Sequence, residues 1–101
     1  MRINVVGRHM DVTDAIYKHV DSKVGKLDKF SDLVQQIEII FWKESTAGES
    51  FMAEVSVDVE HHANFIAKAD SHDLYLAIDE AVNKVSRQLN DFREKLKMEH
   101  R

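Results

Sequence analysis

The chain has 101 residues, of which 44% are hydrophobic and 32% charged, with a formal net charge of −4 and no cysteine. This length allows one compact core, so we expect residues 1–101 to form a single domain. No apolar run reaches the roughly 20 residues of a membrane span, and the N-terminus lacks signal-peptide features, which predicts a soluble cytoplasmic protein. Without cysteine, disulfides, thiol catalysis and thiolate zinc sites are excluded.

The first third of the chain has the pattern of a strand followed by a helix. Residues 2–6 are β-prone, and Gly7 ends the run. Asp11 or Thr13 can cap a helix that we expect to run to about residue 30. The apolar stripe predicted for this helix consists of Ile16, Tyr17, Val20, Val24, Leu27 and Phe30.

The middle of the chain alternates apolar and polar residues, which is the pattern of β-strands. Runs over residues 34–44, 51–60 and about 63–70 have period two, and residues 45–49 have the composition of a turn. We therefore expect three antiparallel strands with one apolar face. The other face is predicted to be acidic and open to water.

The last part of the chain predicts a long amphipathic helix that Asp73 can cap. Its apolar stripe consists of Leu74, Ile78, Val82, Val85, Leu89, Phe92 and Leu96. The order β-α-β-β-β-α predicts an α+β, two-layer fold in which both helices pack on one face of a four-stranded sheet. The right-handed crossover rule predicts that the first strand lies parallel to its neighbour.

The charges are unevenly distributed along the chain. The overall negative charge argues against nucleic acid, since phosphates dominate such binding. However, residues 83–101 contain six basic residues against three acidic ones, whereas residues 32–60 contain one against seven. If the helices pack side by side, a basic helical layer is backed by an acidic sheet face. Charges on exposed helix faces are usually only solvated, so charge alone does not assign a function.

Four short segments, in order along the chain, form a specific set of motifs. They are residues 7–15 (GRHMDVTDA), 23–27 (KVGKL), 73–79 (DLYLAID) and 84–89 (KVSRQL). Together they resemble the bacterial ribosome hibernation promoting factors and the related ribosome-associated inhibitor YfiA. The resemblance spans nearly the whole chain, although the hairpin of residues 34–60 matches only in pattern.

This resemblance implies a fold akin to a double-stranded RNA-binding domain and an activity by occupancy. The family binds the small (30S) ribosomal subunit and its 16S rRNA near the decoding centre, blocks the mRNA and tRNA sites, and inhibits translation in stationary phase or stress. The chain stops soon after the last predicted helix, which points to the short forms. These favour 100S ribosome dimers together with a separate ribosome modulation factor. A monomer off the ribosome is implied, with no cofactor, small-molecule substrate or membrane.

The resemblance also implies which residues contact rRNA. Lys23 and Lys26 stand where the family has contacts from its first helix. Contacts from its second helix correspond to Lys84, Arg87, Arg93 and Lys95, and Arg8 is a weaker correspondence. Members often have a lysine where this chain has Asp91, which puts that one contact in doubt.

Enzyme and metal interpretations find little support in the sequence. The three glycines are isolated, so no phosphate-cradling loop exists, and no nucleophile motif is present. His61 and His62 beside Glu60, with His72 downstream, are adjacent residues that a strand would point to opposite faces, so a turn cluster is favoured over a metal site. Lone histidines such as His19 fit a surface or core-edge role. We expect no catalytic or metal-ligating residue.

Two other functions stay open on the sequence alone. The open sheet face could bind a protein, because Ile40, Trp42, Met52 and Ile66 are predicted to lie there among acidic residues. Sequences of this kind have also been labelled as sigma-factor modulators, which act on a protein partner. A generic double-stranded RNA binder is the other alternative.

Overall fold

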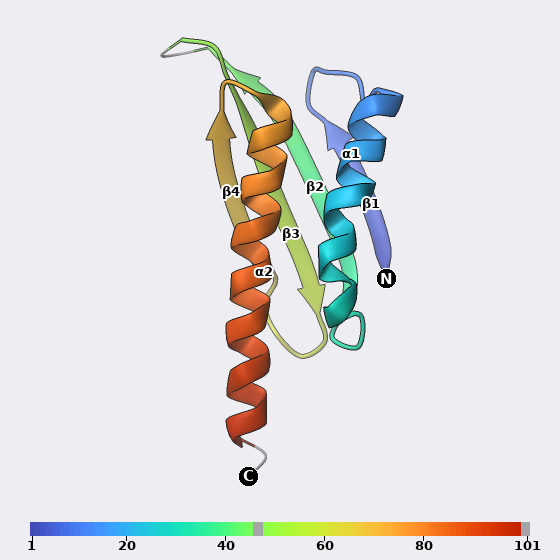
Figure 1. Cartoon of the computed structure of the whole chain (residues 1–101), viewed down its shortest axis with the longest axis vertical. Helices are drawn as coiled ribbons and strands as arrows, with labels where there is room; N and C mark the ends of the chain where they lie inside the picture. Colours follow the sequence, from blue (N-terminus) through green and yellow to red (C-terminus); the bar gives the residue numbers. More distant parts are fainter. Residues whose placement is uncertain (46–47, 100–101) are drawn as a thin grey trace.

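The computed structural model describes residues 1–45 and 48–99, and its element order is the predicted β-α-β-β-β-α (Figure 1). The elements are β1 (Arg2–Gly7), α1 (Asp14–Val24), the 3₁₀ helix η1 (Gly25–Phe30), β2 (Val34–Glu44), β3 (Ser50–Val59), β4 (Phe65–Ser71) and α2 (Leu74–Glu99). None of the helices in these ranges is long and apolar enough to cross a membrane.

The strands form one sheet in the order β1-β2-β3-β4. The first strand is parallel to β2, and the other pairs are antiparallel, as the crossover rule and the hairpin pattern predict. Because successive side chains of a strand point to opposite sides, the sheet has one face toward the helices and one away from them. One row across the sheet faces the helices and consists of Val5, Ile39, Val55 and Ala67. The next row faces away and consists of Val6, Ile40, Glu54 and Lys68.

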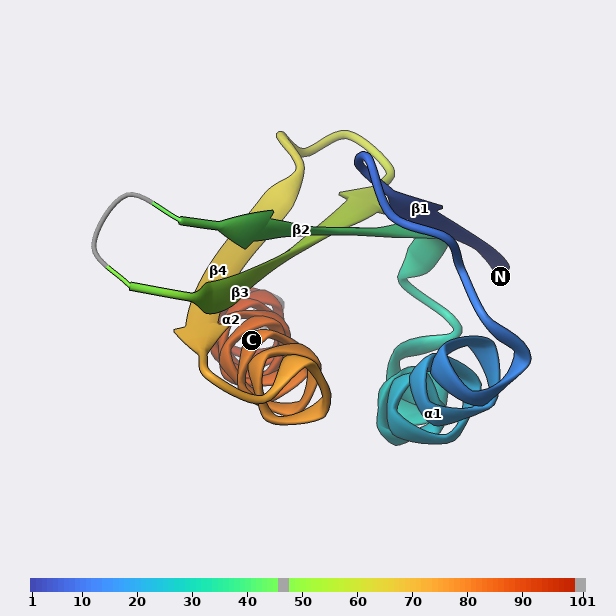
Figure 2. The ribbon, with the colours of Figure 1, turned by 90° about the horizontal axis from the view of Figure 1, so that it is seen from above.

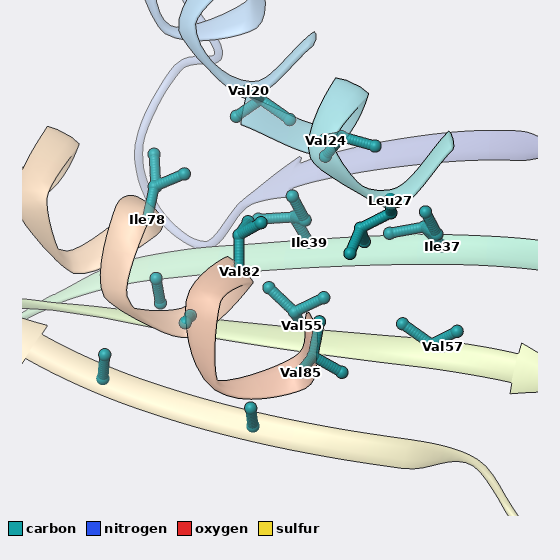
Figure 3. Close-up of a cluster of buried hydrophobic side chains, with 14 of the residues drawn as sticks. Val20, Val24, Leu27, Ile37, Ile39, Val55, Val57, Ile78, Val82 and Val85 are labelled. Atoms are coloured by element: carbon teal, nitrogen blue, oxygen red, sulfur yellow. The ribbon is translucent and has the colours of Figure 1, made fainter. Parts of the chain in front are cut away.

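Both helices cover the same face of the sheet (Figure 2), which confirms the two-layer prediction. The core lies between the layers, where α1 and η1 contribute Val20, Val24 and Leu27 (Figure 3). Within residues 1–45 and 48–99 no polar or charged residue is buried. Burial of apolar side chains at roughly 25 cal/mol per Å² is therefore what holds the helices on the sheet.

Side-chain caps begin both α-helices. The Oγ1 atom of Thr13 accepts a hydrogen bond from the backbone N–H of Ile16 at 3.1 Å, so Thr13 and not Asp11 caps α1. At the start of α2, Asp73 Oδ1 accepts from the backbone N–H of Tyr75 at 2.9 Å, which confirms the predicted cap. These caps fix where each helix leaves the preceding loop.

The prediction of one α-helix to about residue 30 was wrong in kind. The α-helix ends at Val24, and Gly25–Phe30 forms the 3₁₀ helix η1. The reason lies in the spacing of the buried residues, which changes from four, up to Val24, to three, from Val24 through Leu27 to Phe30. A 3₁₀ helix has three residues per turn, so residues three apart lie on the same side.

Three smaller expectations are also corrected. Tyr17 does not widen the core stripe and is 51% exposed, because it lies about 100° around the helix from Ile16. The last strand begins at Phe65 and not at about residue 63, since the chain reverses at His61, which has a positive φ of 61°. The turn predicted at residues 45–49 lies partly outside the described residues.

The helix α2 is longer than the sheet it covers. It spans 26 residues, which at about 1.5 Å per residue is roughly 39 Å, and its last turns extend beyond the sheet (Figure 1). Full burial along α2 ends at Leu89, and Met98 is 71% exposed. The C-terminal turns of α2 therefore expose several faces.

Candidate nucleic-acid interface

Polar contacts join α1 to α2 on the outer side of the helical layer. His19 Nε2 lies 2.7 Å from Asp79 Oδ1, and Lys23 Nζ lies 3.9 Å from Asp79 Oδ2. The His19 ring also packs edge-on against the Tyr75 ring, with 4.7 Å between centroids. One carboxylate thus links two side chains of α1, and Lys23 is held close to α2.

A hollow lies between η1 and α2, further along the same side. Lys26 Nζ donates a hydrogen bond to Asn83 Oδ1 at 3.3 Å. The hollow itself is lined by Lys29, Ser86, Arg87, Asn90 and Asp91. We call Lys26, Lys29, Asn83, Ser86, Arg87 and Asn90 the helix groove. Its cations surround neutral hydroxyl and amide groups, and these side-chain types are the ones that contact phosphate and sugar in nucleic-acid complexes.

Two of the predicted contacts lie on the other flank of α2, beside the edge strand β4. Lys84 Nζ donates to the backbone carbonyl of Lys68 at 2.7 Å. Gln88 Nε2 donates to the carbonyl of Ile66 at 3.2 Å. Lys95, further along this flank, lines a separate hollow. Lys84 and Lys95 are therefore exposed but do not line the helix groove.

The two remaining predicted contacts are engaged elsewhere. The Arg93 guanidinium is bonded to the Asp32 carboxylate, lies 4.9 Å from the centre of the Phe30 ring, and is only 24% exposed. The Arg8 guanidinium lies 4.6 Å from the centre of the Trp42 ring, on the face of the sheet opposite the helices. Of the predicted residues, Arg87 lines the hollow, Lys26 bonds Asn83 one turn before Arg87, and Lys23 lies beside Asp79 one turn earlier still. The other four predicted residues lie apart from these three.

The helical layer is close to neutral as a whole. The residues of α1, η1 and α2 include nine Lys or Arg and eight Asp or Glu. The excess of positive charge is local, because residues 83–97 contain five basic and two acidic residues. Asp91 lines the same hollow as Lys29 and Arg87 and lowers the positive potential there. Any phosphate contacts are therefore expected around the groove and not over the whole layer.

Sequence reasoning missed four residues of the helix groove. Lys29 follows Lys26 by three residues, a spacing that puts both on one side of either kind of helix, but the motif that carries the resemblance ends at residue 27 and does not include it. The other three are neutral and carry no charge signal: Asn83, Ser86 and Asn90. Matching the motifs of the family identified only charged residues as rRNA contacts, so these neutral amide and hydroxyl side chains were not predicted.

The histidines near the sheet do not gather into a metal site. His61 Nε2 pairs with Glu60 at 3.3 Å, and the His62 ring stacks on Phe65 with 4.5 Å between centroids. His72 Nδ1 lies 2.6 Å from the backbone carbonyl of Glu49. Across residues 1–45 and 48–99, no group of three or more potential ligands is placed to hold a metal ion.

Removal of the Asp79 carboxylate provides a test of how the two helices are held. We expect Asp79→Asn to lower the free energy of unfolding by about 1 kcal/mol, because a partly buried charge-assisted hydrogen bond to His19 and the pairing with Lys23 are lost. Urea unfolding followed by circular dichroism measures this change. The matched control is Glu80→Gln, an exposed neighbour with the same charge change. Equal stability of the two variants would contradict a structural role for Asp79.

A sequence model of the Sigma 54 modulation protein / S30EA ribosomal protein family matches residues 3–97. The chain belongs to this family. The family named from the sequence motifs is therefore confirmed. The family description names a modulation protein and a ribosomal protein, and its relatives are ribosome hibernation factors, so the expectation that the chain is not an enzyme is confirmed as well.

Relatives of known name cover nearly the whole chain. The ribosome hibernation promoting factor of Escherichia coli strain K12 is 30% identical over 96% of this chain and 98% of its own length. The ribosome hibernation promoting factor of Azotobacter vinelandii is 32% identical over 94% of this chain and 85% of its own length. The ribosome-associated factor Y of Haemophilus influenzae matches with the same identity and coverage.

Solved structures share the fold. The N-terminal domain of Thermus thermophilus Protein Y has a TM-score of 0.77 and 31% identity, and the match covers 91% of this chain and 99% of that one. A ribosomal subunit interface protein from Coxiella burnetii has a TM-score of 0.82 at 22% identity, covering 93% and 99%, which supports the fold alone. The fold expected from the resemblance is therefore confirmed.

Proposed function

We propose that this chain is a ribosome hibernation factor that acts by occupancy in the cytoplasm. Residues 1–101 act as one ribosome-binding domain that binds the small (30S) ribosomal subunit near the decoding centre. There it contacts 16S rRNA, covers the mRNA and tRNA sites, and inhibits translation in stationary phase or stress. The observation that carries this proposal is the helix groove, whose cations and neutral donors lie together between η1 and α2 in a member of this family.

The contacts at the groove would be to RNA backbone and not to bases. Lysine, arginine, serine and asparagine side chains can each donate to phosphate oxygens. Aromatic platforms for stacked bases are missing from the described groove residues, and Phe30 beneath it is buried. Binding therefore depends on the shape and charge of folded rRNA, and the bulk of the helices excludes other ligands.

Among the residues expected from the family to contact rRNA, the geometry supports different roles. We assign direct phosphate contacts to Lys26 and Arg87, with Lys29 added, and place Lys23 at the rim beside Asp79. Lys84 and Lys95 lie on the β4 flank, where they would meet a second RNA segment. Two residues have supporting roles: Arg93 fixes the loop after η1 through Asp32, and Arg8 packs on Trp42.

The proposal extends to ribosome pairing. The curated relatives of similar length bear the name ribosome hibernation promoting factor, which supports a role in forming 100S ribosome dimers. We propose that ribosome modulation factor acts on the same ribosomes, and that the chain is a monomer away from them. Sucrose-gradient profiles of stationary-phase cells with and without the gene test this part.

Co-sedimentation of the purified protein with isolated small subunits tests the binding itself. Stoichiometric binding is expected at low salt. The three direct phosphate contacts assigned to Lys26, Lys29 and Arg87 alone predict an affinity that falls roughly 40-fold between 50 and 200 mM salt. Excess duplex RNA should compete poorly. Equal competition by duplex RNA would favour a generic RNA binder, and the absence of binding at low salt would contradict the proposal.

A further inference from the structure

The face of the sheet opposite the helices is uncovered by any other element of the described chain (Figure 2). We call this surface the open face. The strand register places the outward residues in successive rows, from Arg2, Gln36 and Asp58 at one end to Trp42, Met52 and Asp70 at the other. The open face and the helix groove therefore lie on opposite sides of the molecule and can be occupied at the same time.

An apolar patch lies near one end of the open face. Val6 is the partner of Ile40 across β1 and β2, and Trp42 is the partner of Met52 across β2 and β3. All four side chains are half-buried and contiguous through β2. The indole of Trp42 is held in place, since its Nε1 donates to Glu44 Oε1 at 2.7 Å. The patch is therefore an apolar surface in which the Trp42 indole is held in one orientation, with the Glu44 carboxylate at its edge.

Carboxylates outnumber cations on the open face. The outward acidic residues are Glu38, Glu44, Glu54, Asp58 and Asp70, and the outward basic residues are Arg2, Arg8 and Lys68. Of these carboxylates, only Glu54 forms an ion pair within the described part of the chain, with Lys68 at 3.5 Å. Arg8 is stacked on Trp42 and not paired with an acid. The open face therefore presents several carboxylates without cationic partners, together with an apolar patch.

We propose that the open face docks an extended, Lys- and Arg-rich segment of a partner protein. Its basic side chains would pair with Glu38, Glu44 and Asp70, and an apolar side chain between them would pack on the patch at Ile40 and Met52, beside the Arg8–Trp42 pair. Nucleic acid does not fit, because its phosphates would meet carboxylates. A second copy through the same face does not fit either, because like charges would be opposed. A sheet face suits an extended segment, because alternate side chains of such a segment point to the sheet.

The fluorescence of Trp42 provides a direct test, because it is the only tryptophan of the chain. The probe is a synthetic peptide with repeats of Lys-Gly-Leu-Gly, in which the lysine and leucine side chains share one face of an extended chain, and its counterpart has glutamate in place of lysine. We expect a saturable change of Trp42 emission with the basic peptide, weaker at higher salt, and none with the acidic peptide. The titration contains no ribosome, so its outcome does not depend on the proposed function.

Charge variants locate the binding surface. Glu38→Lys/Asp70→Lys should weaken the basic peptide at least tenfold, and the milder Glu38→Gln/Asp70→Asn, which keeps the shape, should weaken it several-fold. The matched control is Glu80→Lys/Glu94→Lys on exposed positions of α2, which should bind as the unmodified chain does. A silent Trp42 signal with the basic peptide, or equal weakening in the matched control, would overturn the proposal.

Discussion

The double substitution Lys26→Glu/Arg87→Glu is expected to weaken binding to the small subunit by at least about 100-fold. Each change removes one charge-assisted hydrogen bond, about 1.5–3 kcal/mol, and every 1.4 kcal/mol corresponds to a tenfold change in affinity. The new carboxylates also repel phosphate. Both residues are exposed, so the fold should be little affected. Co-sedimentation with small subunits at fixed salt measures the effect.

The matched control reverses two lysines outside the helices. Lys43→Glu/Lys68→Glu causes the same change in net charge and replaces exposed residues paired with Glu49 and Glu54. It should leave subunit binding within about threefold of the unmodified chain, since distant exposed charges are screened. Lys84 is avoided in the test because it also bonds the carbonyl of Lys68. Equal losses in the two double variants would mean that net charge matters and the helix groove does not.

Replacement of Gly7 by alanine is expected to lower the free energy of unfolding by about 1–3 kcal/mol, the usual cost of overpacking. A Cβ at Gly7 would lie 2.4 Å from the backbone oxygen of Met10 and 3.1 Å from the Phe41 ring. The ring belongs to the buried core and the oxygen to the loop that leads into α1, so neither can move without disturbing the crossover.

Gly25 provides the contrast for this prediction. A Cβ there meets nothing within 4 Å, and Gly25 has helical angles, with φ −54° and ψ −26°. Gly25→Ala should therefore be neutral or stabilise by up to about 1 kcal/mol, since alanine loses less backbone entropy on folding. Thermal unfolding should show a Tm about 4–8 °C lower for each kcal/mol lost in Gly7→Ala. If Gly7→Ala and Gly25→Ala have the same Tm, the close packing of Gly7 against the Met10 oxygen and the Phe41 ring is contradicted.

Most of the fold could be predicted because its determinants are local. Period-two alternation over β2 and β3 and helical spacing over α2 each lie within one segment of the chain. The change from α1 to η1 also has a local signal in the sequence, because the spacing between successive buried residues shifts from four to three at Val24. It was missed because spacings of three and four both count as helical in a single pattern.

The site was harder to predict because it depends on residues far apart in the sequence. Arg93 bonds Asp32, 61 positions away, so nothing near Arg93 indicates that its charge is engaged. The Lys84 side chain points to the carbonyl of Lys68 because β4 lies beside α2 at that point. The Arg8 side chain lies on the open face because Trp42, on which it stacks, points outward from the sheet. Helical geometry gives the angular spacing of the cations around α2, but not which partner each cation meets.

The hydrogen bonds from Lys84 and Gln88 to the edge of β4 have a consequence for how the protein behaves when it accumulates. The outer carbonyls of an edge strand are the groups that an incoming strand from another molecule would bond. Here two of them, on Ile66 and Lys68, already accept from α2 side chains. A strand that added to this edge would therefore first have to displace Lys84 and Gln88 from these carbonyls.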